Sequence, residues 1–380
     1  MELSGERACL TNACQETEYE FFMYVLTQAN VSEIGRTVIC VGSGNEGANG
    51  GHLAGSLERA GTGAGTRTGV SAGTGVNTGT GAGTRTRVNA GTGINTRIGL
   101  GTGGASAASY LPAEVELAVA RYERALNVQL WKNYSDVYRI YLRAPGGQET
   151  ELPASIEGGK YTLRLGQTDI LVYIGEPLPY SAAQEIYLDL IPAGSPYIES
   201  GIWTVRLIPV EVVTGNYYFY LPSSAVRSEE TGFYRPTSEV TLTIPSTASK
   251  VITVGAYDSI YDAYADFSGR GYADTARTVG VVASGLAKPD LAAPGVNILA
   301  PDIYGGYNPV TGTSFATPIV SGSAALLMEW GIVRGNDPFL YGEKVKAYLR
   351  KGARALRGEA EYPNSRVGWG GLCVSSSIPS

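Results

Sequence analysis

Hydrophobic residues are spaced in two different ways along this 380-residue chain. Near the N-terminus, residues 17–30 carry apolar side chains at helical intervals, and residues 36–42 form an almost unbroken apolar run. Such a run is typical of a strand that is buried on both faces of a parallel sheet. The same character returns in the last third of the chain, with a buried strand at 250–256, an apolar helix at 319–330 and an amphipathic helix at 341–356. The two ends of the chain therefore predict one α/β layer.

The middle of the chain alternates apolar and polar residues instead. After a short predicted helix at 113–126, eight runs follow a period of two and are separated by Gly, Pro and Asn turns. This pattern is typical of an antiparallel sandwich or jelly roll. Tyrosines and tryptophans in these runs could form a carbohydrate-binding platform, but alternating positions in strands favour core and cross-strand pairs. The runs lie at 128–131, 137–143, 161–165, 170–174, 185–190, 201–207, 215–221 and 240–244.

A Gly/Thr-rich low-complexity repeat separates these regions. Residues 61–78 are followed at once by a second 18-residue copy, 79–96, which differs only at Arg87, Asn89 and Ile94. Each copy offers one apolar pair, which is too little to offset the ordering entropy of so many glycines. The repeat therefore predicts an irregular surface loop over 61–104 rather than a solenoid, with a presented, extended arm as the alternative.

These changes in pattern divide the chain into four segments. Residues 1–57 and 248–380 are expected to form the two parts of one α/β domain with a parallel sheet. Residues 58–111 form the repeat loop, and residues 112–247 form an inserted all-β unit. The predicted fold class is thus a partial α/β domain interrupted by a jelly-roll or sandwich insertion.

Composition narrows the functional classes. The chain is 43% hydrophobic and 17% charged, and its net charge of −6 includes no basic cluster, so nucleic acid is not expected as a partner. The four cysteines (Cys9, Cys14, Cys40 and Cys373) lack the spacing of a zinc site, and neither a metal nor a cofactor is expected. Neither a signal peptide nor a membrane span is expected from the apolar runs.

The segment with the most specific chemistry is Gly312-Thr-Ser-Phe-Ala-Thr-Pro318, which leads into the apolar helix. This places Ser314 at a helix N-terminus, where unpaired backbone N–H groups and the helix dipole stabilise an oxyanion. Serine is also a common N-cap, which is the structural alternative. Asn45 follows the predicted strand at 36–42, at the edge where α/β sheets place chemistry, and its alternative is a turn asparagine.

Four segments in order resemble the C-terminal half of the subtilisin family of serine proteases: 44–47, 251–255, 289–295 and 312–318. The β insertion, with Asn133-Tyr-Ser-Asp136 and Pro145-Gly146 inside it, resembles the Csp-type germination proteases of clostridia, in which a jelly roll is set into a subtilisin domain. The resemblance implies a serine-type endopeptidase that acts on proteins or peptides, with Ser314 as nucleophile and Asn45 as oxyanion donor. It also implies association with other Csp-type subunits and a location in the spore or the mother-cell cytoplasm.

The chain departs from the family in the residues that would act as the general base of the catalytic triad. A subtilisin uses an aspartate and a histidine from two motifs that precede the asparagine loop, and neither motif precedes Asn45 here. His52 is the only histidine, and it follows the loop, against the family's chain order. Because a serine without a base is a weak nucleophile, the chain is expected to be a fragment that is nearly inert alone. A pseudoprotease that serves as a binding scaffold is the alternative.

Overall fold

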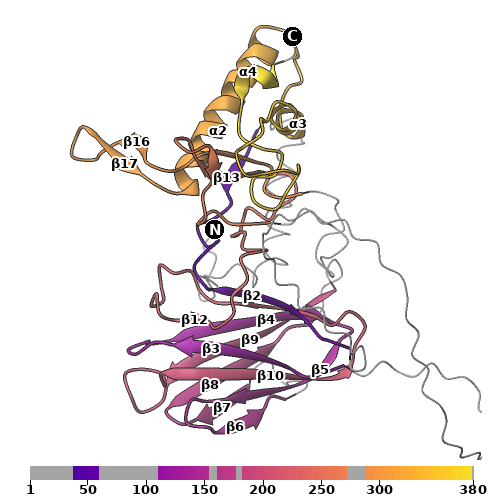
Figure 1. Cartoon of the computed structure of the whole chain (residues 1–380), viewed down its shortest axis with the longest axis vertical. Coiled ribbons are helices and arrows are strands. Elements are labelled where there is room, and N and C mark those ends of the chain that lie inside the picture. The colour runs from indigo at the N-terminus through magenta and orange to yellow at the C-terminus, as the bar shows by residue number, and fades with distance from the viewer. Residues whose placement is uncertain (1–36, 60–109, 154–160, 177–181, 272–286, 379–380) are drawn as a thin grey trace, which may run out of the picture. The chain divides into compact units, whose positions relative to one another are not determined.

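A computed structural model describes residues 37–59, 110–153, 161–176, 182–271 and 287–378 (Figure 1). The chain divides into two compact units, residues 1–57 with 112–380, and residues 58–111. Almost all of the second unit lies outside the described residues. The helix predicted at 17–30 and the repeat loop predicted at 61–104 also lie outside them.

The first layer of the larger unit is a short parallel sheet. Strand β1 (Cys40–Gly42) pairs in parallel with β13 (Ile252–Asp258), which pairs in parallel with β15 (Leu291–Pro294). Strand β14 (Ala263–Tyr264) returns antiparallel beside β13. The two ends of the chain thus meet in one sheet, since β1 and β13 are neighbours although more than 200 residues separate them.

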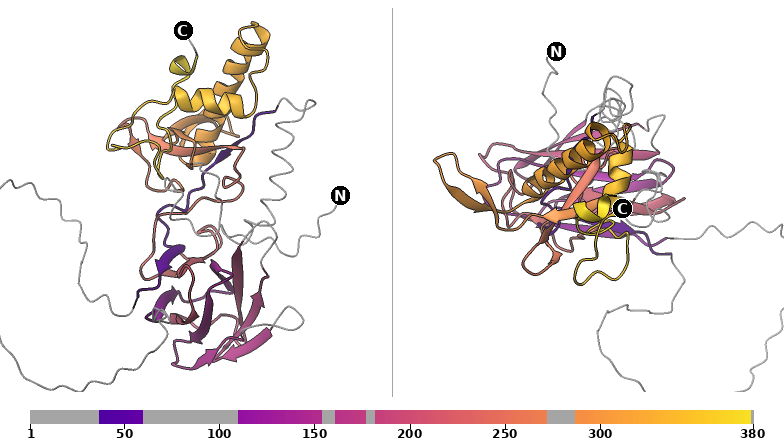
Figure 2. Two further views of the ribbon diagram at one scale, coloured as in Figure 1. Left: turned by 90° about the vertical axis from the view of Figure 1, so that its right-hand side faces the viewer. Right: turned by 90° about the horizontal axis from the view of Figure 1, so that it is seen from above.

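The helices of this layer follow the sheet. They are α2 (Thr313–Met328), the π-helical turn η1 (Glu329–Val333), α3 (Glu343–Lys351) and α4 (Val374–Ser377). Helix α2 packs on β1, β13 and β15 (Figures 1 and 2) and buries Ala316, Val320 and Leu327 in the same core as Val254 and Leu291. The hairpin of β16 (Ile298–Pro301) and β17 (Tyr307–Val310) connects β15 to α2.

The helix boundaries differ from those expected. Helix α2 begins at Thr313, ahead of the apolar helix predicted at 319–330, so that Pro318 lies inside it, and α3 is shorter than the predicted 341–356. Together α2 and η1 (Thr313–Val333) are long and apolar enough to cross a membrane by length and composition. Core helices pass the same test, and one face of α2 covers the parallel sheet.

The strands from β2 to β12 form two antiparallel sheets. Their spatial orders are β12-β3-β10-β5-β6 and β2-β11-β4-β9-β8-β7. Inward side chains alternate along the strands, and Phe219 of the second sheet lies against Phe233 of the first with 5.9 Å between ring centroids. The strands are β2 (His52–Ser56), β3 (Ala113–Val119), β4 (Leu126–Asn133), β5 (Val137–Arg143), β6 (Glu149–Glu151), β7 (Tyr161–Leu165), β8 (Thr168–Ile174), β9 (Ala183–Pro192), β10 (Gly201–Glu211), β11 (Asn216–Tyr220) and β12 (Gly232–Phe233).

Two secondary-structure predictions for this region are wrong. The helix predicted at 113–126 is strand β3, a turn and the start of β4, because Val115, Leu117 and Val119 alternate inward and β3 pairs along its length with β10. Tertiary pairing here overrides the helical tendency of the Ala and Glu residues. No strand forms at 240–244, because its backbone bonds to loops instead of a ladder: Thr241 N donates to Arg270 O and Thr243 N donates to Ser43 O.

The expected boundary at residue 57 also differs from the sheet pairing. Strand β2 lies within the segment assigned to the α/β layer, yet it pairs antiparallel with β11 in the six-stranded sheet. The chain therefore passes from the parallel sheet to the antiparallel one between Gly42 and His52, within ten residues of β1. This short crossing determines where the only histidine of the chain lies.

Candidate active site

The loop after β1 is held by backbone hydrogen bonds on both sides. Ser43 N donates to Val254 O at 2.8 Å, and Gly269 N donates to Gly44 O at 2.8 Å. Gly44 has φ +95°, and a Cβ there would lie 2.4 Å from Cγ2 of Thr243, so both the backbone angle and the close approach require glycine. The loop is thereby fixed at the carboxyl end of the parallel sheet.

The start of α2 faces this loop. Gly312, with φ 150°, turns the chain into the helix, and its N–H donates to Gly295 O at 2.8 Å. Thr313 is buried and Ser314 is exposed in the first turn. The first N–H groups of a helix have no partner within the helix and carry the positive end of its dipole. The hydroxyl of Ser314 therefore lies beside groups that stabilise a developing oxyanion.

Asn45 is joined to this helix start by two hydrogen bonds. Thr313 donates to Asn45 Oδ1 from its backbone N at 3.0 Å and from Oγ1 at 3.1 Å, across 268 residues of sequence. With its oxygen occupied, the side chain of Asn45 has the two hydrogens of Nδ2 left to donate. A Cβ on Gly312 would lie 3.4 Å from this Nδ2, so glycine leaves room next to the donor.

Asn45 and Ser314 line one cavity of about 700 Å³. Sequence reasoning named both residues but missed Thr313, which orients Asn45, and Thr243, which closes the cavity above Gly44. Thr313 could have been noticed from its place within the Gly-Thr-Ser segment, whereas Thr243 carries no local signal. The lining residues are Cys40, Val41, Gly42, Gly44, Asn45, Glu46, Thr243, Thr313, Ser314, Thr317, Pro318 and Ser321.

The titratable groups of this lining are poorly suited to act as a base. Burial raises the pKa of the Cys40 thiol, which keeps it protonated and neutral. The carboxylate of Glu46 accepts hydrogen bonds from Ser223 Oγ at 2.8 Å and from Ser224 N at 3.4 Å. The described lining of the cavity thus contains the Ser314 hydroxyl and the Asn45 amide, but no histidine.

His52 lies in β2 of the antiparallel sheet and does not line the cavity. Its Nδ1 is 3.1 Å from Thr237 Oγ1, and its ring lies 4.4 Å from that of Tyr220, centroid to centroid. Burial lowers the pKa of His52 to about 4, against weaker opposing hydrogen bonds that the ring makes to the backbone at Thr237 and Glu239. At neutral pH it is a buried, uncharged member of the sheet.

Asp290 is also not arranged as the aspartate of a catalytic triad. Asp290 is fully buried in an ion cluster with Lys288, Lys346 and Arg350. Over the described ranges, no group of three or more His, Cys, Asp or Glu side chains is arranged to hold a metal ion. The chemistry that this site supports is nucleophilic attack by a hydroxyl with stabilisation of an oxyanion.

Comparison with known proteins agrees with this chemistry. The family model described as Subtilase family matches residues 212–370. Serine protease AprX of Bacillus subtilis is 34% identical over 159 residues, which cover 37% of this chain and 32% of AprX. Minor extracellular protease Vpr of the same organism is 32% identical over 123 residues, 30% of this chain and 13% of Vpr.

A solved structure covers nearly the whole chain. The CspB protease of Clostridium perfringens superposes with a TM-score of 0.72 at 30% sequence identity, over 97% of this chain and 63% of CspB. The chain therefore spans about a third of AprX and less than two thirds of CspB. The family model, the sequence relatives and this structural neighbour agree, and together they support a subtilisin-family protease of the Csp type.

Proposed function

We propose that this chain carries the nucleophile half of a serine-type endopeptidase site, with Ser314 as nucleophile and Asn45 as side-chain donor of the oxyanion hole. The observation that supports this most directly is the pair of hydrogen bonds from Thr313 to Asn45 Oδ1, which directs the remaining donor toward the cavity that Ser314 lines. A turn asparagine or a simple N-cap would not need this arrangement across the chain. The substrates of such a site are proteins or peptides.

The base of the reaction comes, in this proposal, from polypeptide outside the present sequence. The only histidine of the chain is His52, which is buried in the antiparallel sheet and neutral at pH 7. A nucleophilic serine depends on an adjacent base to remove its proton as it attacks. Alone, the chain should keep only the contribution of the oxyanion hole and binding, which in subtilisin itself is about 10³–10⁴-fold over water.

A fluorophosphonate probe tests this proposal, because it forms a tetrahedral adduct on an activated serine. We expect slow labelling of the full chain at Ser314, abolished in Ser314→Ala and reduced by about 10²–10³-fold in Asn45→Ala, the range measured for the equivalent loss in subtilisin. His52→Ala serves as the matched control and should label like the wild type. Labelling that disappears in His52→Ala would instead make His52 the base and the chain an active hydrolase by itself.

A binding scaffold is the second candidate, favoured by the histidine-free cavity lining. A scaffold predicts no labelling of Ser314 under any condition, and unchanged partner binding in Ser314→Ala. Association with other Csp-type subunits, a role in spore germination and a jelly-roll topology for the antiparallel sheets are further parts of the proposal, and they rest on the resemblance of the sequence to the Csp-type germination proteases.

A further inference from the structure

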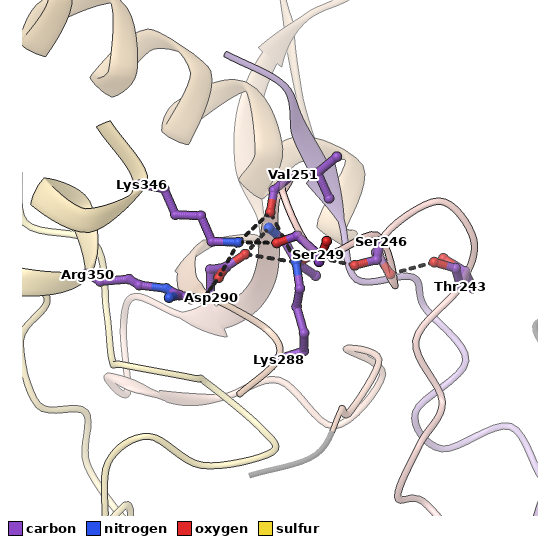
Figure 3. Close-up of polar contacts among 9 residues, drawn as sticks. Thr243, Ser246, Ser249, Val251, Lys288, Asp290, Lys346 and Arg350 are labelled. Atoms are coloured by element: carbon purple, nitrogen blue, oxygen red, sulfur yellow. Dashed lines mark hydrogen bonds and ion pairs between the residues drawn. The ribbon is translucent and has the colours of Figure 1, made fainter. Parts of the chain in front are cut away.

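A buried ion cluster lies where strands β13 and β15 begin (Figure 3). Its centre is Asp290, whose carboxylate accepts hydrogen bonds from Thr253 N at 2.7 Å and Lys288 Nζ at 3.1 Å. Lys346 and Arg350 of helix α3 reach the other carboxylate oxygen. Three cations thus surround one anion in a site where Asp290 and Lys288 have no exposed surface.

Stability alone does not account for this cluster. Removing charges from water is costly, and well-packed apolar residues of similar volume are often at least as stable as a buried ion pair. Here the charges do not balance, so the cost is higher than for a simple pair. A buried cluster of this kind indicates that it holds the surrounding backbone in one conformation. The hydrogen bonds of Lys288 show which part of the backbone is held.

Each hydrogen of the Lys288 ammonium has an acceptor. The three acceptors are Val251 O at 3.0 Å, Thr253 Oγ1 at 2.7 Å and Asp290 Oδ2 at 3.1 Å. Because Thr253 Oγ1 accepts from the ammonium, its own hydrogen points away from Lys288, and it is donated to Ser246 O at 2.6 Å. The cluster therefore sets the direction of a hydrogen-bond chain that leaves it.

That chain continues to the asparagine loop. Ser246 donates to Thr243 O from its backbone N at 2.8 Å and also from its hydroxyl, as Figure 3 shows. Thr243 N then donates to Ser43 O at 3.0 Å, and its side chain lies over Gly44 in the cavity. Hydrogen bonds that are joined through the covalent structure of Ser246 and Thr243 thus link the buried carboxylate to the residues directly before Asn45.

We propose that Lys288 and Asp290 are positioning residues for Asn45, acting through Thr253 and the turn from Thr243 to Ser246. The proposal rests on the proposed function, because it gives the cluster a role in aligning the oxyanion donor. Other bonds also hold this loop, including those from Ser43 to Val254 and from Gly269 to Gly44, so the effect is graded rather than complete.

The protonation of Lys288 supplies a second signature. Burial lowers the pKa of Lys288, while Asp290 opposes the shift and Lys346 and Arg350 add to it. Burial alone would raise the pKa of Asp290, but the three cations outweigh burial and lower that pKa. Cys40 is a further titratable group near this carboxylate, and the negative charge of Asp290 helps to raise the pKa of its thiol. A neutral amine has two hydrogens for three acceptors, so the chain of bonds should weaken as pH rises and Lys288 loses its proton.

Thr253 offers a matched pair of variants in the full chain. Thr253→Val keeps the shape and removes the hydroxyl, whereas Thr253→Ser keeps the hydroxyl. Thr168→Val is the control, because it removes an equally buried hydroxyl that accepts from Glu199 N in the antiparallel sheet. The readout is hydrogen exchange of the Thr313 amide, which is bonded to Asn45, together with the side-chain amide resonances of Asn45.

We expect Thr253→Val to speed exchange of the Thr313 amide by about five- to tenfold, the loss expected for one hydrogen bond in the supporting chain. Thr253→Ser and Thr168→Val should stay within about twofold of the wild type, and wild-type exchange should quicken with pH beyond its intrinsic dependence. If Thr253→Val does not fold, Ser246→Ala removes the hydroxyl bond to Thr243 O and leaves the backbone N–H bond, so it should speed exchange in the same direction by a smaller factor. The proposal would be overturned if a folded Thr253→Val or Ser246→Ala variant had the same Thr313 amide exchange rate and the same Asn45 side-chain resonances as Thr168→Val.

The fluorophosphonate reaction separates this result from the fate of the proposed function. Slower labelling of Ser314 in Thr253→Val, with unchanged half-saturating probe concentration and recovery in Thr253→Ser, would support both. If the wild type does not label at all, the endopeptidase proposal fails, while the exchange measurement still decides whether the cluster positions Asn45.

Discussion

Protonation of the buried His52 should make this protein lose stability in mild acid. His52 is 3% exposed, and its Nε2 is buried without a hydrogen-bond partner among the described residues, so the imidazolium would have an unsatisfied donor. Its pKa is about 4 in the folded chain and 6.5 for the free side chain. Because the folded-state pKa is the lower one, the contribution to stability is fully present above about pH 6.5 and is lost as pH falls through about 4.

The size of the loss follows from the pKa difference. A pKa difference of about 2.5 units corresponds to a total loss of about 3.4 kcal/mol in the free energy of unfolding once the pH is well below 4. On the order of 2 kcal/mol of this loss should have occurred by pH 5. Urea unfolding of the wild type and His52→Asn between pH 7 and 4 measures this. The Asn amide takes the place of Nδ1 beside Thr237 and does not titrate, so the difference between the two unfolding free energies should shrink by this amount as pH falls.

Nuclear magnetic resonance gives an independent check, because tag-free protein has one histidine and therefore one imidazole C2 proton signal. Its titration should have a midpoint near pH 4 in the folded protein. A midpoint at 6.5 or higher, or parallel stability curves for the wild type and His52→Asn, would refute the reasoning. It would also return His52 to consideration as an accessible base.

Three further changes test the packing around the site and in the insertion. Asp136→Asn should destabilise the chain by about 2–4 kcal/mol in urea unfolding, because its buried carboxylate accepts from three backbone N–H groups and the Thr214 hydroxyl. These bonds outweigh burial and lower the pKa of Asp136, so the difference from wild type should narrow as pH falls below its ordinary value of 3.8. Gly47→Ala places a Cβ 2.3 Å from a backbone oxygen and should displace the asparagine loop and slow labelling of Ser314, whereas Gly322→Ala, with nothing within 4 Å, should not. Leu327→Ala empties a fully buried position on α2 and should cost about 2–5 kcal/mol of stability, read as a lowered melting temperature.

The hydrophobic pattern of the sequence and the segment from Gly312 to Pro318 were enough to predict several strands, one helix start and the candidate nucleophile. The apolar run before Gly42 and the one from 250 to 256 predicted the parallel strands β1 and β13, because strands buried on both faces need continuous apolar sequence. Strand β5 matched its period-two run, since alternation reports one buried face directly. Gly312 to Pro318 identified the start of α2 and the candidate nucleophile, because a helix start after glycine is a local event.

Only the tertiary structure decided how distant residues meet. The bond between Thr313 and Asn45 spans 268 residues, and no periodicity in either segment reports it. Residues 113–119 became a strand because β10 lies beside them, and His52 entered the antiparallel sheet because β11 pairs with it. The cluster around Asp290 likewise gathers cations from a loop and from α3, because a buried carboxylate takes hydrogen bonds from whichever donors the fold brings near it.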